Sequence, residues 1–169
     1  LARLLSVDAS VVYVGHVPWC VKNFTYCDVN SHGQKETLPE SEYISHLLDY
    51  LAIGAQQVKW RQVQTFFIGG GTPSLFSDKG IARLLTGIKE RVDLHPNAEI
   101  TLEANPGTVE SQKFIGFQQA GVNRISIGVQ SFQGPKLKRL GRIHSEHQAV
   151  AAVNFALDAS LDSFNIDLM

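Results

Sequence analysis

The 169-residue sequence predicts an α/β fold in which a parallel sheet forms part of an open barrel. Short apolar stretches rich in β-branched residues alternate with amphipathic helical patterns, and brief turns with glycine or proline join them. Such connections between parallel strands are right-handed. The strand–helix steps stop before a barrel would close, so we expect an incomplete barrel. A hydrophobic fraction of 44% favours a single folded domain over residues 1–169.

The first strand is predicted over residues 11–17, because this stretch is β-branched and apolar and is followed by Pro18. Gly15 interrupts it, and we expect a bulge there. A loop with both cysteines of the chain follows. Thr37 and Glu40 have the spacing of a capping box, so the first helix is expected to begin there and to continue with Ile44, Leu47, Leu48, Leu51, Ala55 and Val58 on its apolar face.

A second strand over residues 65–68 leads directly into the glycines of residues 69–71. Ser77 is a suitable N-cap for the next helix, whose core face is expected to contain Ile81, Leu84, Leu85, Ile88 and Val92. The same pattern continues to the end of the chain. We expect further strands at residues 99–103, 124–130 and 164–168, and helices from about Val109 to Gly121, at 136–140 and at 146–159.

Composition excludes several classes of function. The formal net charge is −1, with acidic and basic residues interspersed, so no basic surface for nucleic acid is expected. No apolar run approaches the roughly 20 residues of a membrane helix, and residues 1–10 lack the pattern of a secretory signal. We therefore expect a cytoplasmic protein. The two cysteines are too few for a disulfide scaffold.

Polar residues lie where the predicted strands end. The glycines of residues 69–71, Glu103, Gln130 and Asp167 each fall at the carboxyl end of a strand, which is the edge where barrel-type α/β folds bind ligands. A glycine triplet lets backbone approach a ligand closely, but it is equally consistent with a tight turn or with phosphate bound at the following helix. The joint position of these residues favours a binding site.

Arg142 follows a short predicted helix, from which it is able to reach over the same edge toward a carboxylate or phosphate; solvation at the surface is the alternative. The histidines show no metal-binding spacing, which indicates structural roles. Cys20 and Cys27 are separated by six residues in a loop. By itself this spacing is a weak signal for iron, and free thiols are the default interpretation.

Several longer strings carry a specific resemblance and cover nearly the whole chain in order. They are YVGHVPWC (13–20), YCDVNSH (26–32), GGGTPSLFS (69–77), LEANPGT (102–108), GVNRISIGVQSF (121–132), LGRIH (140–144) and NIDLM (165–169). Together they resemble the N-terminal part of the core of radical S-adenosylmethionine (SAM) proteins, in the heme-chaperone HemW group once classed as coproporphyrinogen III oxidase-like.

The resemblance implies a partial (β/α)6 radical SAM barrel with SAM across its rim and a 4Fe-4S cluster in the loop after the first strand. In the family, a C-x3-C-x2-C motif holds three irons of the cluster. Cys20 and Cys27 match its first and third cysteines, and Phe24 stands at the middle position. The resemblance assigns SAM contacts to Tyr13, Tyr26, Gly70, Gly71, Thr72, Glu103, Gln130, Arg142 and Asp167.

This sequence departs from the family pattern at three places. Phe24 has no lone pair to offer iron, which leaves Asp28, His16 or His32 as substitute ligands. Gly15 reads as a one-residue insertion that would turn Tyr13 to the opposite face of its strand unless a bulge absorbs it. The sequence stops within the Asp167 motif, so the last barrel strand and the heme-ligating region are expected outside these residues.

The resemblance implies a heme chaperone that binds heme, SAM and a 4Fe-4S cluster and passes heme to an acceptor protein. Contact with a membrane is expected only through that acceptor. Oxygen-independent coproporphyrinogen III oxidation is the enzyme alternative, but oxidases of this group carry a further cysteine where this chain has Val29. A degenerate, inactive fragment is a third possibility, motivated by Phe24 and Gly15.

Overall fold

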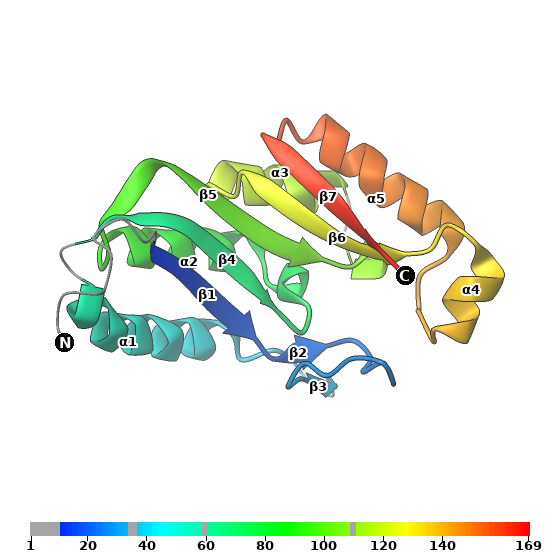
Figure 1. Ribbon diagram of the computed structural model, residues 1–169, viewed down its shortest axis with the longest axis horizontal. Helices are drawn as coiled ribbons and strands as arrows, with labels where there is room; N and C mark the ends of the chain where they lie inside the picture. The colour runs from blue at the N-terminus through cyan, green and yellow to red at the C-terminus, as the bar shows by residue number, and fades with distance from the viewer. Residues whose placement is uncertain (1–10, 34–36, 59–60, 109–110) are drawn as a thin grey trace, which may run out of the picture.

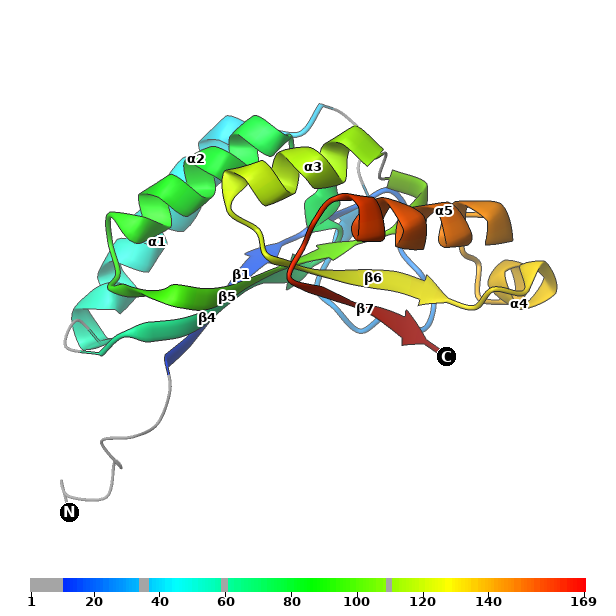
Figure 2. The same ribbon diagram turned by 90° about the horizontal axis from the view of Figure 1, so that it is seen from above.

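A parallel sheet organises the protein, as seen in a computed structural model that describes residues 11–33, 37–58, 61–108 and 111–169. Its strand order is β1-β4-β5-β6-β7, and all neighbouring strands are parallel (Figure 1). Helices α1, α2, α3 and α5 lie on one face of the sheet, and no described helix covers the other face (Figure 2). This arrangement confirms the predicted α/β fold with an open barrel-like sheet.

The elements follow the predicted order. The strands of the large sheet are β1 (Val11–Val17), β4 (Val63–Gly70), β5 (Leu94–Ala104), β6 (Arg124–Gln130) and β7 (Ser163–Leu168). The helices are α1 (Glu40–Val58), α2 (Asp78–Lys89), α3 (Ser111–Ala120), α4 (Gly134–Arg139) and α5 (Glu146–Asp158). The short elements are β2 (Trp19–Cys20), β3 (His32–Gly33), η1 (Pro73–Leu75) and η2 (Pro106–Thr108).

Alternation along the strands separates an apolar face from a polar one. In β6, Ile125, Ile127 and Val129 are fully buried in the core beneath the helices. The intervening residues, among them Ser126 and Gln130, belong to the uncovered face. Each buried aliphatic side chain stabilises the fold by about 1.5–3 kcal/mol, so this pattern fixes which face receives the helices. The uncovered face is left free to carry polar groups.

The predicted bulge at Gly15 is wrong. Residues 12–17 of β1 pair without interruption with residues 65–70 of β4, and the irregularity lies earlier, between Val11 and Val12. Gly15 instead gives the Phe66 ring room to pack, because a Cβ there would lie 3.2 Å from a ring carbon, a tight contact that would require the ring to shift. With no bulge between them, Tyr13 and Gly15 share the face that is turned toward the helices.

The capping box predicted from Thr37 and Glu40 does not form, because α1 begins only at Glu40. The Glu40 carboxylate instead accepts hydrogen bonds from the backbone N–H and the hydroxyl of Ser77, both at 2.6 Å. Ser77 in turn accepts a hydrogen bond from the Gly80 N–H at 2.9 Å, which confirms it as the N-cap of α2. The two helices are therefore joined at their amino ends.

Of the remaining local predictions, the end of α3 is confirmed, and the cysteine loop contains structure that was not predicted. Gly121 ends α3 with a φ of +111°, as its position predicted, whereas the expected start near Val109 lies outside the described residues. The cysteine loop contains a short parallel pair, β2 and β3, that the sequence did not reveal. Within the described residues, no helix combines the length and apolarity needed to cross a membrane.

Removing the Glu40 carboxylate is expected to weaken the junction of α1 and α2. Glu40→Ala should lower the free energy of unfolding in urea by about 1 kcal/mol, since it deletes two hydrogen bonds at a helix start. Glu42→Ala is the matched control, because its side chain is exposed and lies 3.8 Å from the equally exposed His46. Equal losses for both variants would contradict this role of Glu40.

Candidate functional site

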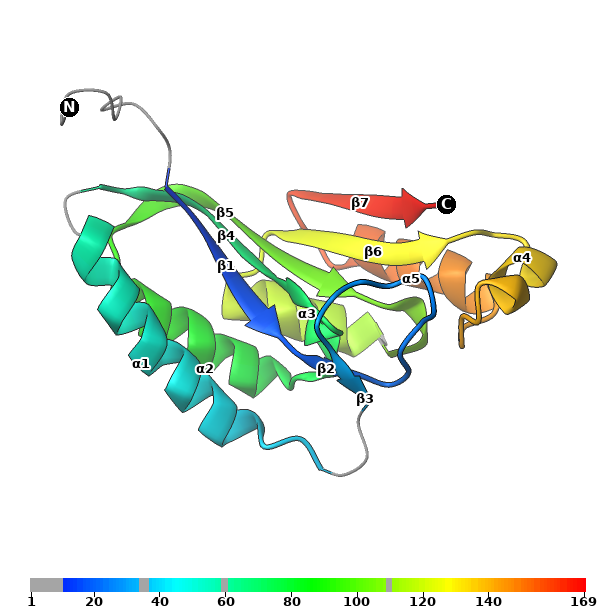
Figure 3. The same cartoon turned by 60° about the horizontal axis from the view of Figure 1, so that its bottom comes forward.

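The carboxyl ends of the strands and the cysteine loop enclose a cavity of about 150 Å³. Figure 3 shows the loop between β2 and β3 lying beside these strand ends. Side chains from β5, β6 and β7 reach the cavity from the uncovered face of the sheet. It is lined by Cys20, Phe24, Tyr26, Cys27, Gly71, Thr72, Glu103, Ala104, Asn105, Ser126, Gly128, Gln130, Arg142 and Asp167.

The glycine loop after β4 is folded tightly against the end of β1. Gly70 has a φ of +113°, and a Cβ on Gly71 would lie 2.5 Å from the Trp19 carbonyl oxygen, so neither position accepts a side chain without strain. The Gly71 N–H donates to the Val17 carbonyl at 2.6 Å, and the Thr72 N–H donates to the Trp19 carbonyl at 2.7 Å. These donors are already engaged inside the chain.

The phosphate alternative for this loop is therefore wrong. The amino end of α2 is filled by Ser77 and by the Glu40 carboxylate, which would repel an anion. The loop forms part of the cavity wall through Gly71 and Thr72, and it does not offer free N–H groups to a ligand.

Glu103 lies at the end of β5 and closes one side of the cavity. Its carboxylate accepts a hydrogen bond from the Gly70 N–H at 2.9 Å. Burial raises the pKa of Glu103 and is the largest effect. The hydrogen bond from Gly70 lowers this pKa, the Asp167 carboxylate raises it, and His16 has the smallest effect, which lowers it. The two carboxylates, Glu103 and Asp167, thus give this side of the cavity a negative field.

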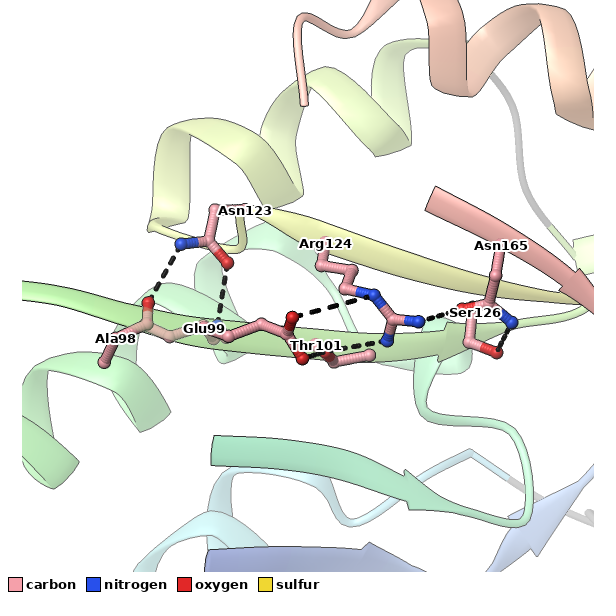
Figure 4. Close-up of polar contacts among 8 residues, drawn as sticks. Ala98, Glu99, Thr101, Asn123, Arg124, Ser126 and Asn165 are labelled. Atoms are coloured by element: carbon pink, nitrogen blue, oxygen red, sulfur yellow. Dashed lines mark hydrogen bonds and ion pairs between the residues drawn. The ribbon is translucent and has the colours of Figure 1, made fainter. Parts of the chain in front are cut away.

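Asp167 is held by a polar network on the uncovered face. Ser126 donates to one carboxylate oxygen at 3.1 Å, and Asn165 donates to the other at 2.9 Å. The Arg124 guanidinium supports Asn165 in turn: it donates to the Asn165 side-chain oxygen at 2.5 Å and to the Thr101 hydroxyl at 3.2 Å (Figure 4). The network fixes the Asp167 carboxylate, although its residue is exposed.

Arg142 is the cation of the cavity, and it reaches over the rim as predicted. Its guanidinium donates to the Tyr26 hydroxyl at 3.1 Å, to the Asn105 side-chain oxygen at 2.5 Å and to the Gly128 carbonyl. It also lies 4.5 Å from the centre of the Phe24 ring. All of these partners are neutral, and its Nε is buried without an acceptor in the structure. A partly buried guanidinium in such surroundings favours an anionic ligand group.

Gln130 ends β6 with a φ of +65°, an uncommon conformation for a residue other than glycine. Its carbonyl accepts a hydrogen bond from the Met169 N–H at 3.0 Å, which holds the end of β7 beside it. This strained turn directs the Gln130 side chain to the cavity wall.

The structure brings most of the predicted site residues together. Tyr26, Gly71, Thr72, Glu103, Gln130, Arg142, Asp167, Cys20 and Cys27 all line the cavity. Gly70 lies just behind it, bound to Glu103. Three further lining residues were not predicted from the sequence: Asn105, Ser126 and Gly128. Asn105 follows Glu103 by two positions and Ser126 precedes Gln130 by four, which is the even spacing of residues on one strand face.

Tyr13 is the exception and does not belong to this site. It stacks on Phe66, with ring centres 6.1 Å apart, and lines a separate apolar groove with Leu47 and Leu51 of α1. Its hydroxyl is buried and has no hydrogen-bond partner among the described residues, and burial raises the pKa of Tyr13. Without a bulge at Gly15, the insertion leaves Tyr13 on the helix-covered side, away from the cavity.

The cysteine loop does not provide the ligands of a cluster held by three thiolates. Cys20 is buried, Cys27 is exposed, both are free, and the Phe24 ring occupies the third position. Asp28, His16 and His32 do not complete the set, because the described residues contain no group of three metal-binding side chains. His16 is engaged elsewhere, by the Asn30 carbonyl at 2.9 Å. These residues do not fit a 4Fe-4S cluster of the usual kind.

The geometry can be compared with known proteins. The Radical SAM superfamily profile matches residues 14–169. The chain belongs to the radical SAM superfamily. Within it, the chain is 54% identical over 158 residues to the heme chaperone HemW of Haemophilus influenzae and 53% identical over 154 residues to that of Escherichia coli. Each match covers 91% of this chain and 41% of the relative, so the chain spans about two fifths of their length.

A solved structure of coproporphyrinogen III oxidase (HemN) from Escherichia coli, described as a radical SAM enzyme, has the same fold. It superposes with a TM-score of 0.83 at 29% sequence identity, over 93% of this chain and 36% of the oxidase. The fold is thus that of a radical SAM core, with an open sheet within the described residues.

The raised pKa of Glu103 predicts a specific pH dependence of stability. Folding raises this pKa, so the contribution of Glu103 to stability is present at low pH and is lost as pH rises through the folded-state pKa. Glu103→Gln keeps an acceptor for Gly70 and removes the buried charge. It should raise the free energy of unfolding at pH 7, with the gain shrinking as pH falls.

Urea unfolding at a series of pH values from neutral to acidic measures this difference. Glu90→Gln, at an exposed position after α2, is the control and should show no such trend. A Glu103→Gln variant that is less stable than the original chain at pH 7 would refute this assignment of a desolvated carboxylate.

Proposed function

We propose that the chain is the SAM-binding part of a HemW-like heme chaperone, which holds SAM at the carboxyl edge of the sheet and serves transfer of heme to an acceptor protein. The residues proposed to contact SAM are Tyr26, Gly71, Thr72, Glu103, Gln130, Arg142 and Asp167, with Gly70 shaping the loop behind them. Heme ligation is assigned to a region outside these residues.

The presence of both signs of charge in one cavity carries the proposal. Glu103 and Asp167 line it together with the Arg142 guanidinium, which lacks an anionic partner among the described residues. SAM has a sulfonium and an ammonium cation together with a carboxylate, so its charges complement both kinds of group. Its ribose hydroxyls and adenine would find the polar groups of Thr72, Gln130 and the neighbouring backbone.

The chaperone role is favoured over porphyrinogen oxidation by two sequence positions. Val29 occupies the place of the further oxidase cysteine, and Phe24 occupies that of a cluster cysteine. The sequence similarity points the same way, since the relatives at 54% and 53% identity are heme chaperones, whereas the oxidase structure is 29% identical. A chaperone that carries heme does not require the ligand in this cavity to be cleaved.

Calorimetric titration of SAM into the 169-residue chain tests the cavity directly. Asp167→Asn should weaken SAM binding about tenfold, because it removes one charge-assisted interaction worth about 1.5 kcal/mol. Asp162→Asn is the matched control: this exposed aspartate lies just before β7, at the end of the strand remote from the cavity. A far-ultraviolet circular dichroism melt of each variant verifies folding.

Two outcomes would count against this proposal. Saturable SAM binding that Asp167→Asn and Asp162→Asn weaken equally would place the ligand elsewhere, and absence of binding by the folded chain would reject the SAM assignment.

The chaperone role is tested on the full-length gene product by hemin titration and transfer to apo-myoglobin. We expect saturable hemin binding and transfer; failure of both would reject the heme assignment.

A further inference from the structure

The cysteine loop is closed by an aromatic stack. The stack consists of Phe24, Tyr26 and Arg142: the two rings lie 5.7 Å apart at an angle of 11°, and the guanidinium lies 4.5 Å from the Phe24 ring centre. The same guanidinium donates to the Tyr26 hydroxyl at 3.1 Å. Stacked rings and a guanidinium over a ring both attract through the aromatic quadrupole, so the three side chains support one another.

The stack attaches the loop to the sheet. Arg142 is fixed by the Asn105 side chain, just beyond the end of β5, and by the Gly128 carbonyl of β6. Asn105 also donates to the Thr72 hydroxyl at 3.1 Å, which connects the glycine loop to the same group. Phe24 is therefore linked through Arg142 to the strand ends that form the cavity.

Phe24 stands where a cluster would require a thiolate. The Cys27 N–H donates to the Phe24 carbonyl at 3.1 Å, so residues 24–27 form a turn whose first side chain packs against Tyr26 and Arg142. The ring lines the cavity together with the two cysteines, and the described residues contain no group of three metal-binding side chains. The position thus provides packing in place of an iron ligand.

We propose that Phe24 takes over the structural role of the cluster in this chain: the aromatic stack holds the cysteine loop on the rim, and the cavity binds its ligand through protein groups without iron. The inference rests on the proposed SAM site for the identity of the ligand, an aminocarboxylate sulfonium nucleoside. It makes Phe24 a positioning residue. The two remaining thiols are left without a metal.

The first test is anaerobic reconstitution with iron and sulfide, followed by desalting and measurement of bound iron and of the visible absorption of iron–sulfur clusters. The original chain should retain no stoichiometric iron, and Phe24→Cys should retain it together with the visible band. Leu157→Cys is the matched control, because it adds a thiol at an exposed site on α5 and should retain none. A stoichiometric cluster in the original chain, or none in folded Phe24→Cys, would overturn the proposal.

The second test concerns the loop itself and uses hydrogen exchange in the iron-free chain. Phe24→Ala should speed exchange of the amides of residues 20–27 at least tenfold, whereas Phe24→Tyr, which keeps a ring, should preserve their protection. Phe132→Ala, at an exposed phenylalanine that does not line the cavity, should leave the loop unchanged. Unchanged exchange in Phe24→Ala would contradict the positioning role.

SAM titrations separate this inference from the proposed function. The dissociation constant of the original chain should be the same with added iron and with a chelator. A chain that binds SAM only after iron loading overturns the iron-free cavity while the SAM assignment stands. A chain that fails to bind SAM yet shows the expected iron and exchange results loses the SAM assignment, while the role of Phe24 stands.

Discussion

Parallel strand direction, combined with helices on a single face, is the constraint on which the rest of the molecule depends. Because β1, β4, β5, β6 and β7 all run the same way, every strand ends at one edge, and residues distant in sequence meet there. Because α1, α2, α3 and α5 cover one face, the apolar side chains of the strands pack against the helices on that face (Figure 2). The other face is free to carry charged groups, and the cavity forms where this polar face reaches the carboxyl edge.

Two hydrogen-bond networks of different character meet at this edge. The first runs through Arg124, Asn165 and Ser126 to Asp167, and gives a fixed negative group. The second is centred on Arg142, which is satisfied by neutral acceptors and an aromatic ring. A site that combines a fixed anion with a cation bonded to neutral groups selects a ligand carrying both signs of charge. The same second network holds the cysteine loop, so ligand binding and loop order depend on shared residues.

The sequence predicted those features that depend on local patterns. Strand alternation, helix faces and the Ser77 cap need only neighbouring residues, and the carboxyl-edge residues follow once the strands are parallel. The misses depend on distant partners. Glu40 matched a capping pattern locally but binds Ser77, 37 positions away, and Gly15 looked like a bulge because the Phe66 ring that fills its space belongs to another strand. Arg142 was predicted at the rim, but its neutral partners come from three other segments.

Hydrogen exchange of the original chain with and without SAM, resolved by peptide, tests the location of the ligand most directly. We expect SAM to slow exchange in the peptides over residues 69–72, 103–105, 126–130 and 165–167, which meet at the carboxyl edge. We expect no change in residues 47–54, which contribute to the separate groove beside Tyr13. Protection confined to that groove, or spread evenly over the sheet, would contradict a SAM site at the carboxyl edge.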